Sequence, residues 1–226
     1  MFLFYDGPEP PAGVFDMFTS LKPSLNTCKT RSLYDLLATN NWAVLKGSVY
    51  TIATETTTLS PDAAATDKHL QTCFDHWVNV SNSVAEVPGL VASVAFQPYP
   101  AALARRAKEI DAQLGGTGDL IAFDDSVDRI IFEFDFSYWP GIKANDRKID
   151  DATVRLYSGM KDIVDSAVGA GLIPDGYRPL FMNDGYFRQD YWGRLNPESR
   201  ALAESVRDQV DPNKFWVERT AGGFLL

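Results

Sequence analysis

The sequence is poor in cysteine and in basic residues, and it contains no long apolar run. Two cysteines, Cys28 and Cys73, stand in 226 residues, too few for a disulfide framework or a cysteine-based zinc site. No apolar stretch approaches the ~20 residues that span a bilayer. Lys and Arg number 21 against 30 Asp and Glu, for a net charge of -9. An acidic chain of this kind argues against nucleic acid and anionic membrane as partners.

The first residues do not form a signal peptide. They lack a basic leading region and the necessary length, so we expect a cytoplasmic location for the chain as it stands. Their apolar pattern predicts a strand over Phe2–Tyr5 instead. A chain that opens inside a strand suggests that a segment upstream is missing.

The strongest pattern lies around residues 130–139. From Ile131 to Ser137 apolar and polar residues alternate, which is typical of a strand with one packed and one polar face. The packed face carries four aromatic side chains, which require a covering layer of helices. The two faces are Phe132, Phe134, Phe136 and Tyr138 on one side, and Ile131, Glu133, Asp135 and Ser137 on the other.

The rest of the chain alternates strands with helices. This order predicts an α+β fold, an antiparallel sheet with helices on one face and an open polar face. The expected strands are 2–5, 46–57, 89–98, 130–139 and 179–182. The expected helices are 13–21, a helix opening at Ser60-Pro61-Asp62 with Ser60 as N-cap, 101–114, 149–170, and a last helix opening at Asn196-Pro197; segment 30–38 is of undecided type.

The polar face of the central strand is the first candidate site. Glu133 and Asp135 lie on the same side of one strand, ~7 Å apart, and Gln97 and Ser93 can share that face from another strand. Carboxylates there could serve as an acid or base in a pocket floor. The alternative is a solvated outer face of an antiparallel sheet, which the pattern alone favours.

Two other motifs point to chemistry only weakly. His69, Cys73 and His76 share one helix face, but no fourth ligand stands out, so we predict a polar flank and no metal site. Gly115–Asp119 is glycine-rich without a Walker lysine, and we predict a helix end and a turn.

The segment Phe181–Gly193 is the densest cluster of polar and aromatic residues. Aromatic rings beside amides and an arginine can bind a flat ligand by stacking and hydrogen bonding. A surface that docks onto another domain is an equally good interpretation.

An ordered series of motifs resembles the C-terminal half of fungal FAD-linked oxidases of the berberine-bridge-enzyme-like group. The resemblance spans nearly the whole chain, and each motif is weak by itself while the ordered set is fairly specific. The matching stretches are Phe4–Pro8 with Pro11–Asp16, Phe96–Pro100, Gly115-Gly116, Trp139, Gly171, Met182–Gly185 with Gln189, Asp211-Pro212, Phe215 and Gly222–Phe224.

The resemblance implies an N-terminal FAD-binding domain of PCMH type, a substrate domain whose open sheet face covers the flavin, and a tail that returns to the FAD domain. By this comparison residues 1–178 are the substrate-binding domain, residues 179–226 are the returning segment, and the FAD-binding domain is absent. Many relatives have tyrosine after the asparagine that corresponds to Asn183, where this chain has Asp184, so no catalytic tyrosine is assigned there. Members of the group are often secreted.

The combined interpretation is the substrate-domain part of an FAD-linked oxidoreductase of secondary metabolism. FAD belongs to the complete enzyme, and the expected partners are a small organic substrate and a separate FAD-domain chain. The alternatives are a cofactor-free binding protein or cyclase derived from such an oxidase, and an inactive truncated remnant. The predicted residues are Glu133 and Asp135 for catalysis, Gln97, Ser93, Tyr138 and Tyr186 for substrate, and Asn183, Asp184 and Gln189 for cofactor.

Overall fold

The structure is a computed structural model that describes residues 3–39, 46–116, 118–220 and 223–226. The chain divides into two compact units, Met1–Gly47 and Ser48–Leu226. The boundary expected near residue 178 lies inside the second unit. In the described part of the chain, no helix combines the length and the apolar character needed to cross a membrane.

The first unit holds two short helices, α1 (Asp16–Thr19) and α2 (Leu33–Thr39). The first is shorter than the expected helix over 13–21. The strand expected over Phe2–Tyr5 is not formed at Leu3, Phe4 and Tyr5, and residues 1–2 lie outside the described residues. A strand needs a neighbour to complete its hydrogen bonds, and the described residues of this unit contain no other strand.

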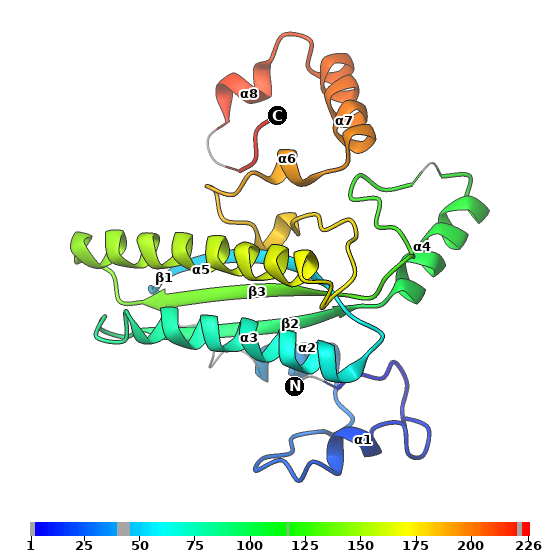
Figure 1. Cartoon of the computed structure of the whole chain (residues 1–226), viewed down its shortest axis with the longest axis vertical. Coiled ribbons are helices and arrows are strands. Elements are labelled where there is room, and N and C mark those ends of the chain that lie inside the picture. Colours follow the sequence, from blue (N-terminus) through cyan, green and yellow to red (C-terminus); the bar gives the residue numbers. More distant parts are fainter. Residues whose placement is uncertain (1–2, 40–45, 117, 221–222) are drawn as a thin grey trace. The chain divides into compact units, whose positions relative to one another are not determined.

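The second unit is a mixed α+β structure, which confirms the predicted fold class (Figure 1). Three strands and a series of helices alternate along the chain from residue 49 to residue 138, and helices of varied length follow. The elements are β1 (Val49–Thr58), α3 (Ala63–Asn82), β2 (Val91–Tyr99), α4 (Ala101–Gln113), β3 (Arg129–Tyr138), α5 (Lys143–Gly169), the 3-10 helix η2 (Met182–Asp184), α6 (Tyr191–Arg194), α7 (Pro197–Val210) and α8 (Phe215–Arg219).

The strand predicted to organise the chain is the centre of the sheet. The strand order is β1-β3-β2, and both pairings are antiparallel. Phe134 of β3 lies opposite Ala53 of β1 and opposite Val94 of β2. This register carries the alternation of β3 across the whole sheet, so that one face is apolar and the other is partly polar.

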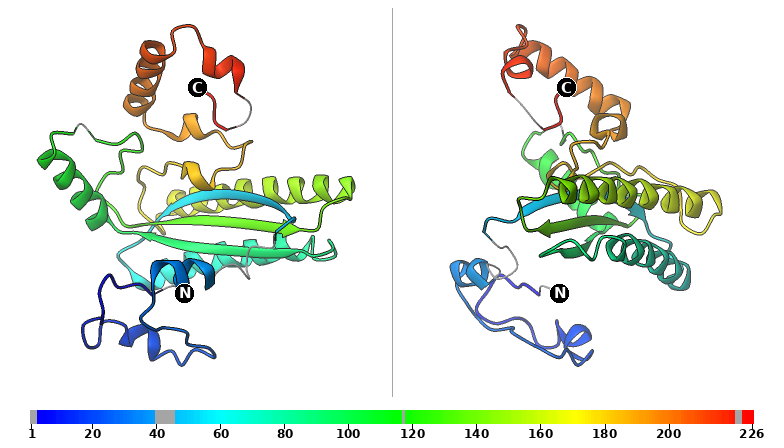
Figure 2. Two further views of the ribbon diagram at one scale, coloured as in Figure 1. Left: turned by 180° about the vertical axis from the view of Figure 1, so that it is seen from behind. Right: turned by 90° about the vertical axis from the view of Figure 1, so that its left-hand side faces the viewer.

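Helices α3 and α5 cover the apolar face, and Figure 2 shows both running along the sheet. The aromatic row of β3 is almost completely buried between the strands and these helices. Burial of each of these side chains contributes on the order of 2–3 kcal/mol to folding. The shared core contains Phe132, Phe134, Phe136, Tyr138, Cys73, Val80, Ile149, Ala152, Leu156 and Met160.

Helix α4 covers one end of the opposite face. Ile131 of β3 is buried there against Ala104 of α4 and Phe123 of the following loop. Helix α4 therefore lies on this face, which differs from the expectation that all helices cover the other one. Toward the other end of β3, Glu133 and Asp135 are half-buried, and Ser93 of β2 is exposed.

Several element ends differ from the sequence predictions. Helix α5 begins at Lys143, six residues before the predicted start, and Asp62 rather than Ser60 is the N-cap of α3, since its side chain accepts from the Ala64 N–H at 2.9 Å. The predicted start at Asn196-Pro197 is confirmed for α7, but α8 follows it.

The strand predicted over 179–182 is wrong. Residues 179–181 lie beside β1 without forming a ladder, and η2 begins at Met182. Pro179 has no N–H to donate, and its carbonyl accepts from the Thr56 hydroxyl. A side-chain hydrogen bond, rather than the ladder of a fourth strand, therefore joins this segment to β1.

Gln189 closes the outer edge of β1 in the same way. Its side-chain oxygen accepts from the Thr54 N–H at 3.1 Å, and its Nε2 donates to the Thr54 carbonyl at 2.7 Å. The same oxygen also accepts from the Tyr186 N–H at 2.9 Å. An edge strand exposes unpaired backbone groups, and the Gln189 amide takes the place of a neighbouring peptide unit.

We expect Gln189→Ala to destabilise the chain by ~2–3 kcal/mol, because the buried N–H and carbonyl of Thr54 lose their partner. Urea unfolding followed by circular dichroism measures this. The matched control is Gln209→Ala, which removes an exposed amide bonded to Ser205 within α7 and is expected to change stability by less than ~0.5 kcal/mol. Equal effects of the two substitutions would contradict the role given to Gln189.

Candidate acid–base site

Three carboxylates and two neutral polar side chains gather on the polar face, and we call them the carboxylate cluster. Gln97 of β2 is its centre, since its Nε2 donates to Glu133 Oε2 at 2.8 Å and to Asp184 Oδ2 at 2.9 Å. Ser93 of β2 donates to Asp135 Oδ2 at 3.2 Å. Glu133 and Asp135 share the face because they are two residues apart on β3, and η2 brings in Asp184.

Burial and mutual repulsion favour the protonated forms of these acids. Burial, followed by the charges of Asp135 and Asp184, raises the pKa of Glu133 to about 7. The pKa of Asp135 is raised by burial, against the hydrogen bond from Ser93. The pKa of Asp184 is also raised by burial, against the hydrogen bond from Gln97. A carboxyl with a pKa close to neutral can both accept and release a proton under ordinary conditions.

The cluster brings together five of the nine residues predicted from the sequence as site residues. Glu133, Asp135, Gln97 and Ser93 lie on the face where the alternation placed them. Asp184 was predicted as a cofactor contact, and the structure places it 7% exposed against Gln97.

Two predicted substrate contacts lie elsewhere. Tyr138 is buried on the helix side, and its hydroxyl donates to Asp146 at 2.9 Å. Burial and this hydrogen bond raise the pKa of Tyr138 to about 12. The hydroxyl of Tyr186 donates to Asp150 of α5, and burial followed by that bond raises its pKa. Neither hydroxyl joins the carboxylate cluster.

The two remaining predicted cofactor contacts have different environments. The Asn183 side chain is exposed on η2. The Gln189 amide is buried and engaged with Thr54 and the Tyr186 backbone.

The helix face with two histidines and a cysteine is part of the core. His69 is buried with its Nε2 2.8 Å from the Thr57 hydroxyl, and Cys73 Sγ lies 3.7 Å from the same nitrogen. Burial lowers the pKa of His69 and raises that of Cys73 to about 12. His76 points toward α5, with its Nε2 3.1 Å from the Leu156 carbonyl. These residues join α3 to β1 and α5 rather than forming a polar flank.

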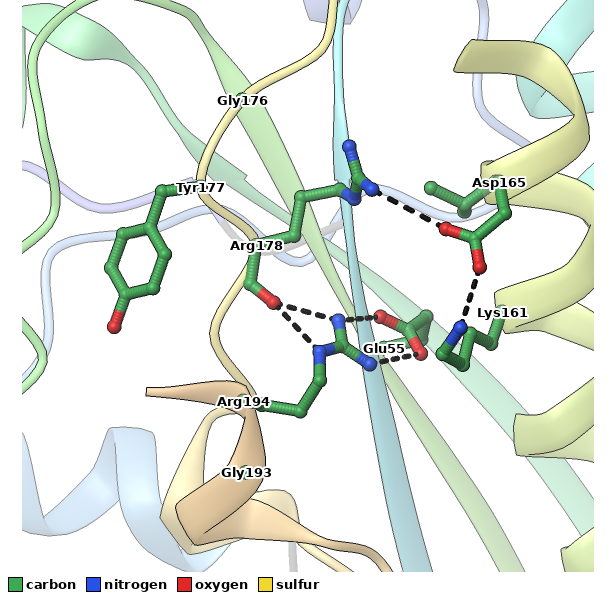
Figure 3. Close-up of a pocket in the computed structure, with 9 residues that line it drawn as sticks. Glu55, Lys161, Asp165, Gly176, Tyr177, Arg178, Gly193 and Arg194 are labelled. Atoms are coloured by element: carbon green, nitrogen blue, oxygen red, sulfur yellow. Dashed lines mark hydrogen bonds and ion pairs between the residues drawn. The ribbon is translucent and has the colours of Figure 1, made fainter. Parts of the chain in front are cut away.

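A charged pocket of about 290 Å³ lies beside β1, and Figure 3 shows it. Arg194 of α6 forms two hydrogen bonds to the carboxylate of Glu55, at 3.0 and 2.5 Å, and two to the Arg178 carbonyl, at 3.1 and 2.6 Å. Asp165 of α5 pairs with Lys161 and with Arg178. These charges neutralise one another and anchor the segment that follows α5 to the edge of the sheet.

The sequence analysis did not single out the residues of this pocket. One signal was present, since Glu55 stands alone among threonines at a position that β-strand alternation places on the apolar face. A carboxylate at such a position needs a buried cation. The sequence could not show that Arg194, 139 residues away, supplies it.

Neither the carboxylate cluster nor the charged pocket fits the diphosphate of FAD. The carboxylate cluster is anionic and would repel a diphosphate, and in the charged pocket each cationic side chain already pairs with an acid. Anion sites in proteins use free backbone N–H groups or unpaired cations. We therefore assign no residue to FAD and derive no chemical step through it.

Fold and site together define an α+β protein with an acid–base cluster on the polar face of an antiparallel sheet. Over all 226 residues the chain is 33% identical to a protein of Arthroderma benhamiae named "Uncharacterized FAD-linked oxidoreductase". The chain spans 43% of the length of that relative. This similarity supports the FAD-linked oxidoreductase part of the resemblance and does not bear on the berberine-bridge-enzyme-like subtype.

Two further comparisons gave no match. No protein-family model matches the chain. No solved structure matches it.

Proposed function

We propose that this chain provides the substrate face of an FAD-linked oxidoreductase of the berberine-bridge-enzyme-like type, with Glu133 as the proton acceptor. The observation that carries the proposal is the position of Glu133. Its carboxyl is half-buried on the open part of the sheet, hydrogen-bonded to Gln97, and has a pKa of about 7. The similarity to a protein named as FAD-linked supports the reaction class.

The proposed role of Glu133 is general-base catalysis. Oxidation of a carbon next to oxygen or nitrogen releases a proton as well as electrons, and a positioned carboxylate with a pKa near the working pH takes up such a proton efficiently. Asp135, bonded to Ser93, is the second candidate base on the same face. The exposed Ser93 hydroxyl and the half-buried Gln97 amide are available to orient a small polar substrate.

In this proposal FAD is held by a part of the enzyme outside these 226 residues. The acidic character of the carboxylate cluster and the pairing of the charged pocket support this assignment. A separate chain or an additional domain could contribute the flavin, and secondary metabolism is the proposed setting.

A chimera tests the proposal. This chain replaces the matching 43% of the Arthroderma benhamiae relative, and the unaltered relative is the positive control. We expect the chimera to retain a flavin absorption spectrum after desalting and to oxidise at least one member of a panel of alcohols and amines. A chimera that holds flavin but leaves every substrate of the active relative unchanged would contradict the proposal.

A cofactor-free binding protein or cyclase is the second candidate. The observation that favours it is that the carboxylate cluster is assembled from residues of this chain and is too acidic to bind a diphosphate. Two measurements together distinguish the candidates: the absorption spectrum of the isolated chain with added FAD, and the activity of the chimera. A colourless chain whose chimera is also inactive would favour the cofactor-free function.

A further inference from the structure

Gln97 contacts two acids that come from distant parts of the chain. It lies 36 residues before Glu133 and 87 residues before Asp184, and its Nε2 is within 2.9 Å of an oxygen of each. Gln97 thereby joins β2, β3 and η2 at one atom. A nitrogen with two hydrogens has one to donate to each carboxylate.

This geometry restricts the two carboxylates. One oxygen of Glu133 lies 2.8 Å, and one oxygen of Asp184 lies 2.9 Å, from the same nitrogen. The two like charges therefore face each other across one amide. The amide nitrogen donates to one oxygen of each acid, so both contacted oxygens are acceptors. Asp184 is buried, and Glu133 is half-buried, so water screens their repulsion only in part.

We propose that Gln97 is a positioning residue, which holds the carboxyls of Glu133 and Asp184 side by side so that the pair shares one proton. The catalytic role of this pair rests on the proposed function. A pair that holds one proton leaves Glu133 able to accept a second proton, from substrate. The remaining groups on this face are consistent with that assignment. Asp135 is bonded to Ser93, and its charge adds to that of Asp184 in raising the pKa of Glu133. Among the described residues, no Lys or Arg side chain bonds to any of the three acids.

The two acids of such a pair titrate together. Loss of one proton makes loss of the next more difficult, so the pair shows two separated midpoints that belong to both groups. The Gln97 hydrogen bonds stabilise the ionised forms and lower both midpoints, while the neighbouring charge raises the upper one. Removing Gln97 and removing Asp184 should therefore move the Glu133 titration in opposite directions.

Carboxyl titration by ¹³C NMR on the full chain tests the inference, with the Glu133 signal assigned by its loss in Glu133→Gln. The wild-type midpoint is expected at about 7. Gln97→Leu is expected to raise it by about 1–2 pH units, and Asp184→Asn is expected to lower it by about 1. The matched control Gln71→Leu, which removes an exposed amide from Asp75 of α3, is expected to leave it unchanged.

A Glu133 midpoint that stays within ~0.3 pH units of the wild-type value in Gln97→Leu would overturn the inference. If Gln97→Leu does not fold, Asp184→Asn decides instead, and an unmoved or higher Glu133 midpoint in that variant overturns the shared proton. These readouts need no catalytic activity. Failure of the inference is therefore distinct from failure of the proposed function, which the chimera reports separately.

Discussion

Replacing Arg194 by methionine is expected to destabilise the chain by ~3–5 kcal/mol, the cost of leaving a buried carboxylate without its cation. The Glu55 side chain is 2% exposed, and Arg194 donates to both of its oxygens. The Thr56 N–H also bonds to Glu55 Oε1, but a single neutral donor cannot replace a guanidinium. Methionine keeps much of the arginine volume, so the loss reports charge and hydrogen bonding. Urea unfolding at neutral pH measures it.

Two further variants show whether the buried charge is the cause. Arg200→Met breaks an exposed ion pair with Glu204 and is expected to cost less than ~1 kcal/mol. The double substitution Glu55→Leu with Arg194→Met removes both charges and is expected to be more stable than Arg194→Met alone, since apolar residues often replace a buried pair at little cost. A double variant that is less stable than the single one would contradict the unpaired Glu55 charge as the cause.

Replacing Glu133 by glutamine is expected to lower kcat/KM for substrate oxidation by ~100-fold or more in the active chimera, because the general base is lost while the shape is kept. The glutamine resembles the protonated acid, so the fold should be retained. Asp135→Asn tests the second candidate on the same face, and we expect a smaller loss. The surface control Glu86→Gln removes an acid paired with Lys148 and is expected to leave the rate unchanged.

A larger loss in Asp135→Asn than in Glu133→Gln would move the role of base to Asp135. An equal small loss in both would remove the carboxylate cluster from the mechanism. Stability measurements distinguish an inactive enzyme from an unfolded one.

The folded pKa of Glu133, about 7, lies above its ordinary value of 4.5, so the folded state binds this proton more tightly than the unfolded state. Glu133 therefore makes the stability of the chain depend on pH. The contribution of Glu133 to stability is fully present below pH 4.5 and is lost as the pH rises to about 7. Glu133→Gln does not titrate, so its stability relative to the wild-type chain should increase between pH 5 and pH 8. Thermal melts at the two pH values measure the difference.

The sequence was sufficient to predict the three strands of the sheet and the aromatic face of β3. Alternation placed Phe132, Phe134, Phe136 and Tyr138 together on a buried face, because successive residues of a strand point to opposite faces. The same rule placed Glu133 and Asp135 together. Helix ends were less predictable, because capping depends on local backbone geometry, as the N-cap at Asp62 shows.

Three features of the structure depend on contacts that alternation cannot report. Tyr138 lies on the buried face, and its hydroxyl donates to Asp146 there rather than facing a substrate. No strand forms over 179–182, and the side chains of Glu55 and Gln189 bond to backbone groups of Thr56 and Thr54 at that edge of β1. Glu55 and Arg194 are 139 residues apart, and a pair so distant is invisible to local pattern.

By itself, the sequence determined the α+β class, the central strand and the face on which its acids lie, since these follow from short-range periodicity and composition. Only the tertiary structure decided that Gln97 bridges Glu133 and Asp184 and that Arg194 neutralises Glu55. The physical reason is that the charge state of an acid depends on its burial and on its neighbours in space. Those neighbours come from segments that the chain brings together only when it folds.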